Sequence, residues 1–388
     1  MNVNDVRDKH NAGKRGIARL IDHPLALASF RHWVRLSRAG GGIDPRYRWR
    51  AAQVTALSPF GAALRAAERL SWNRQAPAVA IAHPPVFILG HWRTGTTHLH
   101  NLMTRDPQFG FVSTFQVLVP ESCLLPFNPL RPLIAWCAPA RRHMDRMPLG
   151  LDLPQEEEFA LCNRCGHSFY VGWYFPRRMD ELFRKYVLFE GLSEPERIGW
   201  SETYLDVLKK ATIRTNGRPL VLKNPVNTAR IPTLLQLFPQ AKFIHVYRDP
   251  YTVFKSTLNF HRATLDMVAF QKIPDSEIER NVLTFYRDMM SRYLQDRTRI
   301  PEGNLVEVRF EDLERNPIEH MAAIYQELGL SRWDEARPHV ERYLQTQAEY
   351  RKNDFPFTSA DLEKVDQHWG FALDAWGYTR RTPSGFSD

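Results

Sequence analysis

Four short, mainly apolar runs recur along the chain, and the first is bounded by Pro85 and Gly90. The runs lie at 86–89, 220–222, 242–247 and 305–309. Between and after them, apolar residues recur every three or four positions, at about 96–103, 156–162, 181–189, 200–215, 231–238, 251 onward, 276–299 and 318–328. Short apolar strands that alternate with helices are typical of a parallel sheet covered on both faces. The pattern therefore predicts an α/β fold.

Two regions depart from this alternation. Residues 1–80 hold only helical patterns, including an amphipathic stretch at 16–38 and a second helix at about 59–70. Residues 110–180 are rich in loops, with six prolines between 120 and 150. We therefore predict a helical N-terminal segment (1–80) and a single α/β domain (81–388), within which 110–180 forms a loop-rich insertion. The insertion and its edge carry nine aromatic residues that suit either a core or an apolar pocket: Phe109, Phe111, Phe115, Trp136, Phe169, Tyr170, Trp173, Tyr174 and Phe175.

Composition places the chain among globular proteins. It has 388 residues, of which 43% are hydrophobic and 24% are charged. No stretch reaches the ~20 apolar residues that a membrane-spanning helix needs, and the first residues lack the apolar region of a secretory signal. Four cysteines are too few for a disulfide scaffold and fit a reducing compartment. We therefore expect a cytoplasmic protein.

The net charge of +9 is concentrated at the N-terminus. Residues 1–80 hold 14 basic but only 5 acidic residues, so the whole excess lies there. Within the stretch 16–38, Phe30 and Trp33 accompany Arg31, Arg35 and Arg38, which predicts peripheral contact with an anionic membrane. The alternative is that the segment packs on the sheet. No helix-turn-helix, zinc-finger or RNA-binding motif accompanies the charge, so nucleic acid is not an expected partner.

A glycine-bounded loop follows the first predicted strand. The sequence Gly90-His-Trp-Arg-Thr-Gly-Thr-Thr97 has the glycine spacing of a P-loop, but Thr96 stands where a P-loop has lysine, and the cation is Arg93. Backbone N–H groups and a helix N-terminus favour a phosphate there. No apolar strand ends in the aspartate that a magnesium-dependent nucleotide hydrolase would use. The loop therefore suits an anion bound without metal, and a degenerate P-loop kinase or NTPase that uses ATP and Mg²⁺ is the alternative.

A second motif follows the third predicted strand. Arg248 stands at the carboxyl end of that strand, where ligands of α/β proteins bind. Its guanidinium can bind a phosphate through two parallel hydrogen bonds, and Ser256 lies in the helix that follows. The alternative is that Arg248-Asp249-Pro250 is only a helix start, with Asp249 as its N-cap.

Together these motifs resemble the PAPS-dependent sulfotransferases, in particular the bacterial, tyrosylprotein-like and carbohydrate-type branches. Arg-Thr-Gly-Thr-Thr at 93–97 matches their [KR]-[ST]-G-T-T loop, and Arg248 with Ser256 matches their second signature. Leu222–Pro225 resembles an LK-x-P turn, and Val306–Pro317 resembles a segment near the end of their core. The resemblance runs from about 84 to 353 and excludes 1–80.

The resemblance implies PAPS (3′-phosphoadenosine 5′-phosphosulfate) as sulfuryl donor, without a metal. The loop would hold the 5′-phosphosulfate, Arg248 and Ser256 the 3′-phosphate, and a basic cluster at Arg351 and Lys352 would close the site. The nucleotide-binding residues that it implies are Arg93, Thr94, Gly95, Thr96, Thr97, His98, Arg248, Ser256, Arg351 and Lys352.

The implied reaction moves the sulfuryl group to a hydroxyl of a small-molecule, lipid or carbohydrate acceptor by in-line displacement, with 110–180 on the acceptor side. Arg93 would stabilise the leaving bisphosphate, and a base must take the hydroxyl proton. Where the tyrosylprotein enzymes place a glutamate, residues 111–115 hold no carboxylate. The candidate bases, in order of preference, are Glu157, Glu158, Glu156 and His98. The acids also suit a plain helix start after Pro154.

Cys162, Cys165 and His167 invite a zinc interpretation. A structural zinc site needs four ligands, and the remaining cysteines, at 123 and 137, do not form a second pair with the same spacing. Core or loop cysteines are therefore the prediction.

Overall fold

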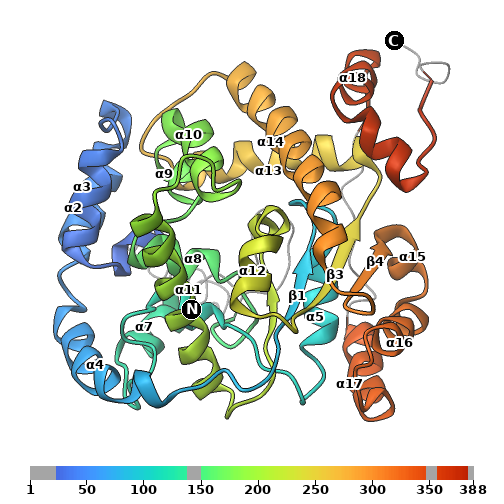
Figure 1. Ribbon diagram of the computed structural model, residues 1–388. Coiled ribbons are helices and arrows are strands. Elements are labelled where there is room, and N and C mark those ends of the chain that lie inside the picture. The colour runs from blue at the N-terminus through green and yellow to red at the C-terminus, as the bar shows by residue number, and fades with distance from the viewer. Residues whose placement is uncertain (1–22, 138–149, 347–355, 383–388) are drawn as a thin grey trace, which may run out of the picture.

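A computed structural model describes residues 23–137, 150–346 and 356–382. Its centre is a four-stranded sheet in which every pairing is parallel, in the order β2-β1-β3-β4 (Figure 1). The strands are β1 (Val86–Leu89), β2 (Val221–Lys223), β3 (Lys242–Tyr247) and β4 (Leu305–Arg309). All four predicted strands are present, and only β2 is shifted, by one residue.

The register brings the carboxyl ends of three strands to the same edge. β1 lies between β2 and β3, with Ile88 opposite Lys223 on one side and Leu89 opposite His245 on the other. The loop after β1 is therefore flanked by the residues that follow β2 and β3. The two sequence motifs, 155 positions apart, share this edge for that reason.

Helices cover both faces of the sheet. Side chains along each strand alternate between the two faces, so successive residues of β1 pack against different helices. Val86 and Ile88 of β1 pack against α5 (Thr96–Met103), α16 (Pro317–Glu327) and α17 (Trp333–Thr346). Phe87 and Leu89 pack into the larger core. The helices that contribute to that core include α12 (Ile231–Leu237), α13 (Pro250–Val268), α14 (Asp275–Asp296) and α18 (Ser359–Trp376). This arrangement confirms the predicted P-loop-like parallel sheet flanked by helices.

The remaining α-helices precede β2 or follow β4 directly. They are α2 (Phe30–Ala39), α3 (Arg48–Leu57), α4 (Ala62–Gln75), α6 (Thr114–Leu118), α7 (Leu130–Cys137), α8 (Glu158–Arg164), α9 (Val171–Tyr174), α10 (Met179–Tyr186), α11 (Glu194–Arg214) and α15 (Phe310–Arg315). The start of α11 is earlier than predicted, because Ser193 and Glu196 form a capping box there. Within the described ranges, no helix is both long and apolar enough to span a bilayer.

The described part of the N-terminal segment packs on the end of α13 and the residues after it. His23 Nε2 lies 2.9 Å from the Val268 carbonyl oxygen, and the Asp44 N–H donates to that of Phe270 at 3.0 Å. Trp33 is buried in the same core as Phe87 of the sheet, so it is not the membrane-facing residue that the sequence predicts. The division of the chain at residue 80 stays a prediction, but a shared core crosses it.

The insertion 110–180 contributes mainly core within its described residues. Phe169, Tyr170, Trp173, Tyr174 and Phe175 are all buried and belong to the main apolar cluster. Among the nine aromatic residues, Trp136 is the one that is clearly exposed. Packing therefore favours the core interpretation for most of them.

Candidate active site

The loop between β1 and α5 depends on its two glycines. Gly90 and Gly95 have φ angles of 139° and 99°, which favour glycine. A Cβ atom on Gly90 would lie 2.5 Å from the Val246 carbonyl oxygen, and one on Gly95 would overlap the Phe310 ring. The Gly90 N–H donates to Thr228 Oγ1 at 2.8 Å. The sequence spacing of the glycines thus reflects two close approaches of the backbone to its neighbours.

The residue at the N-cap position of α5 has no side chain that could cap the helix. Its N-cap residue is Gly95, whereas at α13 the Asp249 carboxylate accepts hydrogen bonds from the first backbone N–H groups. Thr96 and Thr97 form the first turn of α5, so their N–H groups and hydroxyls border the loop. A helix start with these properties attracts an anion. Thr94 differs from its neighbours, because its hydroxyl donates to the His91 carbonyl oxygen within the loop at 2.8 Å.

The two arginines of the sequence motifs meet across this loop. Arg93 has a φ angle of 71°, and its Nε donates to Ser256 Oγ at 3.0 Å. Arg248 Nη1 donates to the Arg93 carbonyl oxygen at 3.2 Å, and its guanidinium lies 4.4 Å from the centre of the Phe310 ring. Burial lowers the pKa of the Arg248 guanidinium below its ordinary value. The structure therefore brings Arg93, Arg248 and Ser256 together in one cluster.

His98 borders the same cluster. Its ring meets Phe310 edge-on, with the ring centres 6.3 Å apart, so it lies on the Phe310 side of the loop. Arg351 and Lys352, the predicted closing residues, lie outside the described residues.

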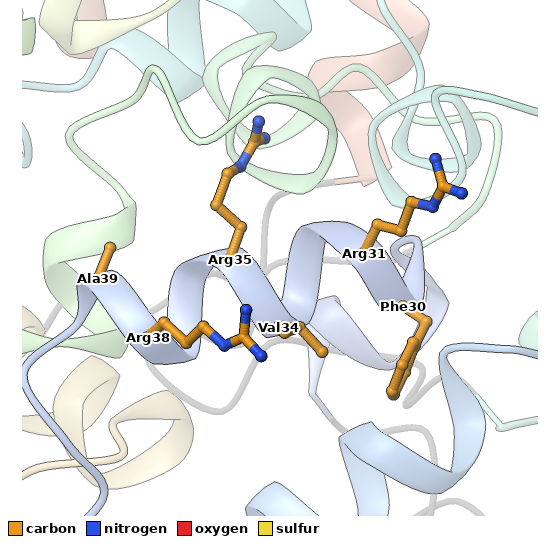
Figure 2. A pocket seen from close by; sticks show the side chains of 6 residues that line it. All are labelled: Phe30, Arg31, Val34, Arg35, Arg38 and Ala39. Atoms are coloured by element: carbon orange, nitrogen blue, oxygen red, sulfur yellow. The ribbon is translucent and has the colours of Figure 1, made fainter.

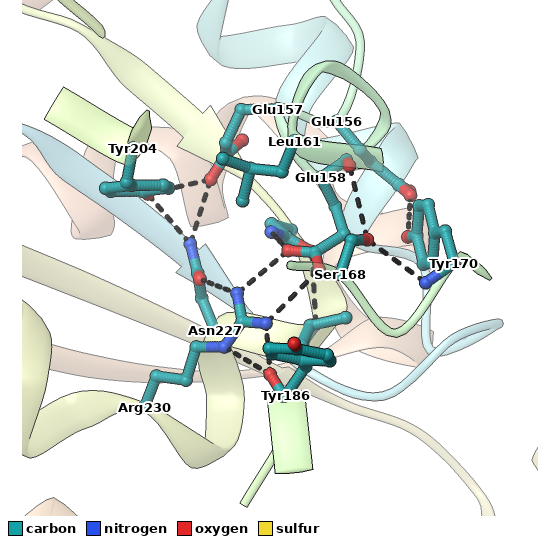
Figure 3. Close-up of polar contacts among 12 residues, drawn as sticks. Glu156, Glu157, Glu158, Leu161, Ser168, Tyr170, Tyr186, Tyr204, Asn227 and Arg230 are labelled. Atoms are coloured by element: carbon teal, nitrogen blue, oxygen red, sulfur yellow. Dashed lines mark hydrogen bonds and ion pairs between the residues drawn. The ribbon is translucent and has the colours of Figure 1, made fainter. Parts of the chain in front are cut away.

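The three acidic residues at 156–158 pack against the segment 223–230, which begins at the last residue of β2 (Figure 3). Each acid has its own partner there, and Figure 3 shows those of Glu157 and Glu158. Glu156 pairs with Lys223, and Glu157 Oε1 accepts from Asn227 Nδ2 at 2.8 Å. Glu158 pairs with Arg230 at 2.8 Å. The run is thus fixed against the sheet edge at three successive residues.

Glu157 and Glu158 are both fully buried, with no exposed surface. Glu157 also accepts from the Tyr204 hydroxyl at 2.9 Å, and its Oε2 atom has no hydrogen-bond partner among the described residues. Desolvation by burial raises the pKa of Glu157 to about 7. Glu158 and Arg230 form an ion pair from which solvent is excluded. Because both side chains are buried, the structure does not favour the predicted order of candidate bases, in which Glu157 and Glu158 precede Glu156.

Glu156 is the acid of this run whose side chain stays partly accessible to solvent, with 12% of its surface exposed. It accepts a hydrogen bond from the Tyr170 hydroxyl, which in turn receives the Trp92 Nε1–H at 3.4 Å. Trp92 precedes Arg93 in the loop, so one tyrosine connects Glu156 to the loop. The sequence did not single out Lys223 as a site residue, although its place in the LK-x-P turn at a strand end was a usable signal.

The cysteine pair belongs to no group of potential metal ligands among the described residues. Cys162 and Cys165 are free thiols, and burial raises the pKa of each. The Cys162 carbonyl oxygen lies 2.7 Å from His32 Nε2. In the part of the chain that the structure describes, no group of three or more His, Cys, Asp or Glu residues could hold a metal ion.

The fold and the loop define a P-loop-like α/β protein, and comparison with known proteins specifies its family. Residues 84–335 match the model of the sulfotransferase family. An omega-hydroxy-beta-dihydromenaquinone-9 sulfotransferase, Stf3, from Mycobacterium bovis is 33% identical over 356 residues, which are 92% of this chain and 91% of that protein. A protein of the same name from Mycobacterium tuberculosis matches equally well. The chain therefore belongs to the sulfotransferase family.

Solved structures agree with this assignment at the level of the fold. The sulfotransferase STF9 from Mycobacterium avium aligns with a TM-score of 0.65 at 21% identity, covering 90% of this chain and 96% of that one. STF1 from Mycobacterium tuberculosis aligns with a TM-score of 0.63 at 18% identity, covering 95% and 99%.

Proposed function

We propose that this sulfotransferase moves the sulfuryl group of PAPS onto a hydroxyl group of a hydrophobic acceptor. The observation that carries the proposal is the cluster of Arg93, Ser256 and Arg248 at the carboxyl edge of the sheet. Two cations and a hydroxyl beside an uncapped helix start suit a ligand with two separate phosphate groups. Family membership supports a sulfate donor of this kind over ATP with Mg²⁺.

The residues present fit the two phosphate groups of PAPS. The loop and the first turn of α5 would hold the 5′-phosphosulfate, and Arg248 with Ser256 would hold the 3′-phosphate. The positive φ angles of Gly90 and Gly95 let the backbone follow the tight path that this loop needs. Phe310 lies against both Gly95 and Arg248 and keeps the two subsites in a fixed relation.

Bound PAPS would supply an electrophilic sulfuryl group with a bisphosphate as leaving group. Arg93 would offset the charge that develops on that leaving group, because a fixed donor at a developing charge stabilises the transition state. We assign the base to Glu156, which would accept the proton of the acceptor hydroxyl as its oxygen attacks sulfur. Lys223, paired with Glu156, would hold that carboxylate in position.

The acceptor we propose is a lipophilic alcohol. The name of the Mycobacterium relatives specifies a hydroxylated menaquinone derivative, which is hydrophobic and bears a hydroxyl. The same class of acceptor would suit this chain at 33% identity. We also propose a cytoplasmic location, which the four free cysteines support because free thiols persist under reducing conditions.

Transfer of label from radiolabelled PAPS tests the proposal. The purified protein is incubated with an isoprenoid alcohol, a short aliphatic alcohol, a phenol and a sugar, and labelled sulfate esters are separated by chromatography. We expect product with the isoprenoid alcohol above all, and none from the Arg93→Ala variant. Phosphate transfer from ATP that requires Mg²⁺, with no sulfate ester from any acceptor, would establish the kinase alternative instead.

A further inference from the structure

The outer face of α2 combines arginines with apolar side chains. A shallow hollow of about 630 Å³ lies along it, lined by Phe30, Arg31, Val34, Arg35, Arg38 and Ala39. Figure 2 shows the three arginines spaced along the helix, with Val34 between them and Phe30 at the helix start. None of the described residues that line this hollow is acidic. The hollow is therefore both positively charged and partly apolar.

Large exposed apolar residues accompany this hollow on the neighbouring helices. Trp49 of α3, Phe60 in the turn before α4 and Leu70 of α4 are 72%, 75% and 71% exposed. Figure 1 places α2, α3 and α4 along one side of the molecule. Scattered apolar residues are ordinary on a protein surface, but a concentration of them marks an interaction site.

The charge on these helices is almost entirely positive. Residues 23–80 contain nine arginines and two acidic residues. Neither acid offsets the arginines of the hollow, because Asp44 pairs with Arg177 and the buried Glu68 pairs with Lys210. The exposed surface of these helices therefore has a basic character.

We propose that this surface docks the enzyme on an anionic lipid bilayer. We define the docking face as the hollow on α2 together with Trp49, Phe60 and Leu70. Its arginines would bind lipid phosphates, and its apolar side chains would enter the headgroup region. Nucleic acid is a poorer fit, because a phosphate backbone offers no apolar partner to Leu70 and Val34. The docking proposal rests on the proposed function in one respect: docking would bring the enzyme to a lipophilic acceptor.

Co-sedimentation with vesicles tests this docking. The full-length protein is mixed with phosphatidylcholine vesicles, with or without phosphatidylglycerol. We expect binding to the anionic vesicles and little to the neutral ones. Arg31→Glu with Arg38→Glu should weaken binding at least about 30-fold, since a basic residue near an anionic surface contributes about 1 kcal/mol and about 1.4 kcal/mol is a factor of ten. Phe60→Ser should weaken binding roughly tenfold by removing the inserted ring.

A matched control separates the docking face from net charge alone. Arg280→Glu with Arg342→Glu makes the same change in charge at exposed positions on α14 and α17, and it should leave vesicle binding within about twofold of wild type. Equal losses in the two double variants would overturn the proposal. Failure of the wild-type protein to bind anionic vesicles would overturn it too, as would binding to a DNA duplex that displaces the vesicles.

Adenosine 3′,5′-bisphosphate binding distinguishes this proposal from the proposed function. All the surface variants should bind that nucleotide as the wild type does. Vesicle binding without nucleotide binding in the wild type would support docking and count against PAPS. Nucleotide binding without vesicle binding would support PAPS as the donor and would overturn the docking proposal.

Discussion

Replacing Glu157 by glutamine distinguishes a buried structural acid from a catalytic base. Glutamine keeps the shape of the side chain, and its carbonyl oxygen can still accept from Tyr204 and Asn227. If Glu156 is the base, the Glu157→Gln variant should keep most of its turnover. If Glu157 is the base, turnover should fall by roughly 10²–10⁴-fold, the usual loss when a general base is removed.

The stability of the variant should also respond differently to pH. Burial raises the pKa of Glu157 from 4.5 to about 7, so between these values the folded state binds a proton that the unfolded chain releases. The wild type is therefore stabilised fully below pH 4.5, and it loses that contribution as pH rises through about 7. At about 1.4 kcal/mol per pKa unit, the loss is on the order of 3 kcal/mol. Glutamine does not titrate, so the free energy of unfolding of the Glu157→Gln variant does not decrease for this reason as pH rises.

Urea unfolding at a series of pH values measures the effect. The free energy of unfolding of the variant minus that of the wild type should increase across this pH window by about 3 kcal/mol. Taking the difference between the two proteins removes the contributions of other titrating groups. A difference that stays constant with pH would refute the assignment of Glu157 as a buried proton-binding acid, and lost turnover would refute the choice of Glu156.

Three further predictions concern the nucleotide site and the base. Arg248→Ala should weaken binding of adenosine 3′,5′-bisphosphate by ~1.5–3 kcal/mol in calorimetry, while adenosine 5′-monophosphate should bind as before; equal losses would indicate a role in folding. Glu156→Gln should lower kcat by roughly 10²–10⁴-fold with unchanged nucleotide affinity, and near-normal kcat would exclude it as the base. Turnover should survive EDTA, because Arg93 supplies the cation; activity lost to the chelator and restored by Mg²⁺ would contradict this.

The strands and the phosphate loop could be predicted because their signals are local. The run Val86–Leu89 is apolar throughout, since helices cover both faces of the strand. Gly90 and Gly95 mark the ends of the loop, where positive φ angles require them. The meeting of Arg93 with Ser256 followed only from the resemblance, because no local pattern shows that the ends of β1 and β3 are adjacent.

Which of the three acidic residues at 156–158 are buried could not be predicted, because the residues that bury them are distant in sequence. Glu157 and Glu158 are buried by Tyr204 and Arg230, which come from α11 and from the segment after β2. Spacing along a helix shows that three adjacent acids point in different directions, but not which direction faces solvent. The burial of Trp33 has the same cause, since the Phe270 ring that it contacts is more than 200 residues away.

The contact between the N-terminal segment and the end of α13 constrains how the chain folds during synthesis. His23 and Val268 are 245 residues apart, so His23 must wait for most of the chain before its partner exists. At ~5–20 residues per second, translation of that interval takes roughly 12–50 s. Throughout it, Trp33 on the buried side of α2 lacks the Phe270 ring against which it finally packs. The ribosome-bound intermediate is therefore a natural client for chaperones, and its N-terminal helices are among the last parts of the fold to reach their final packing.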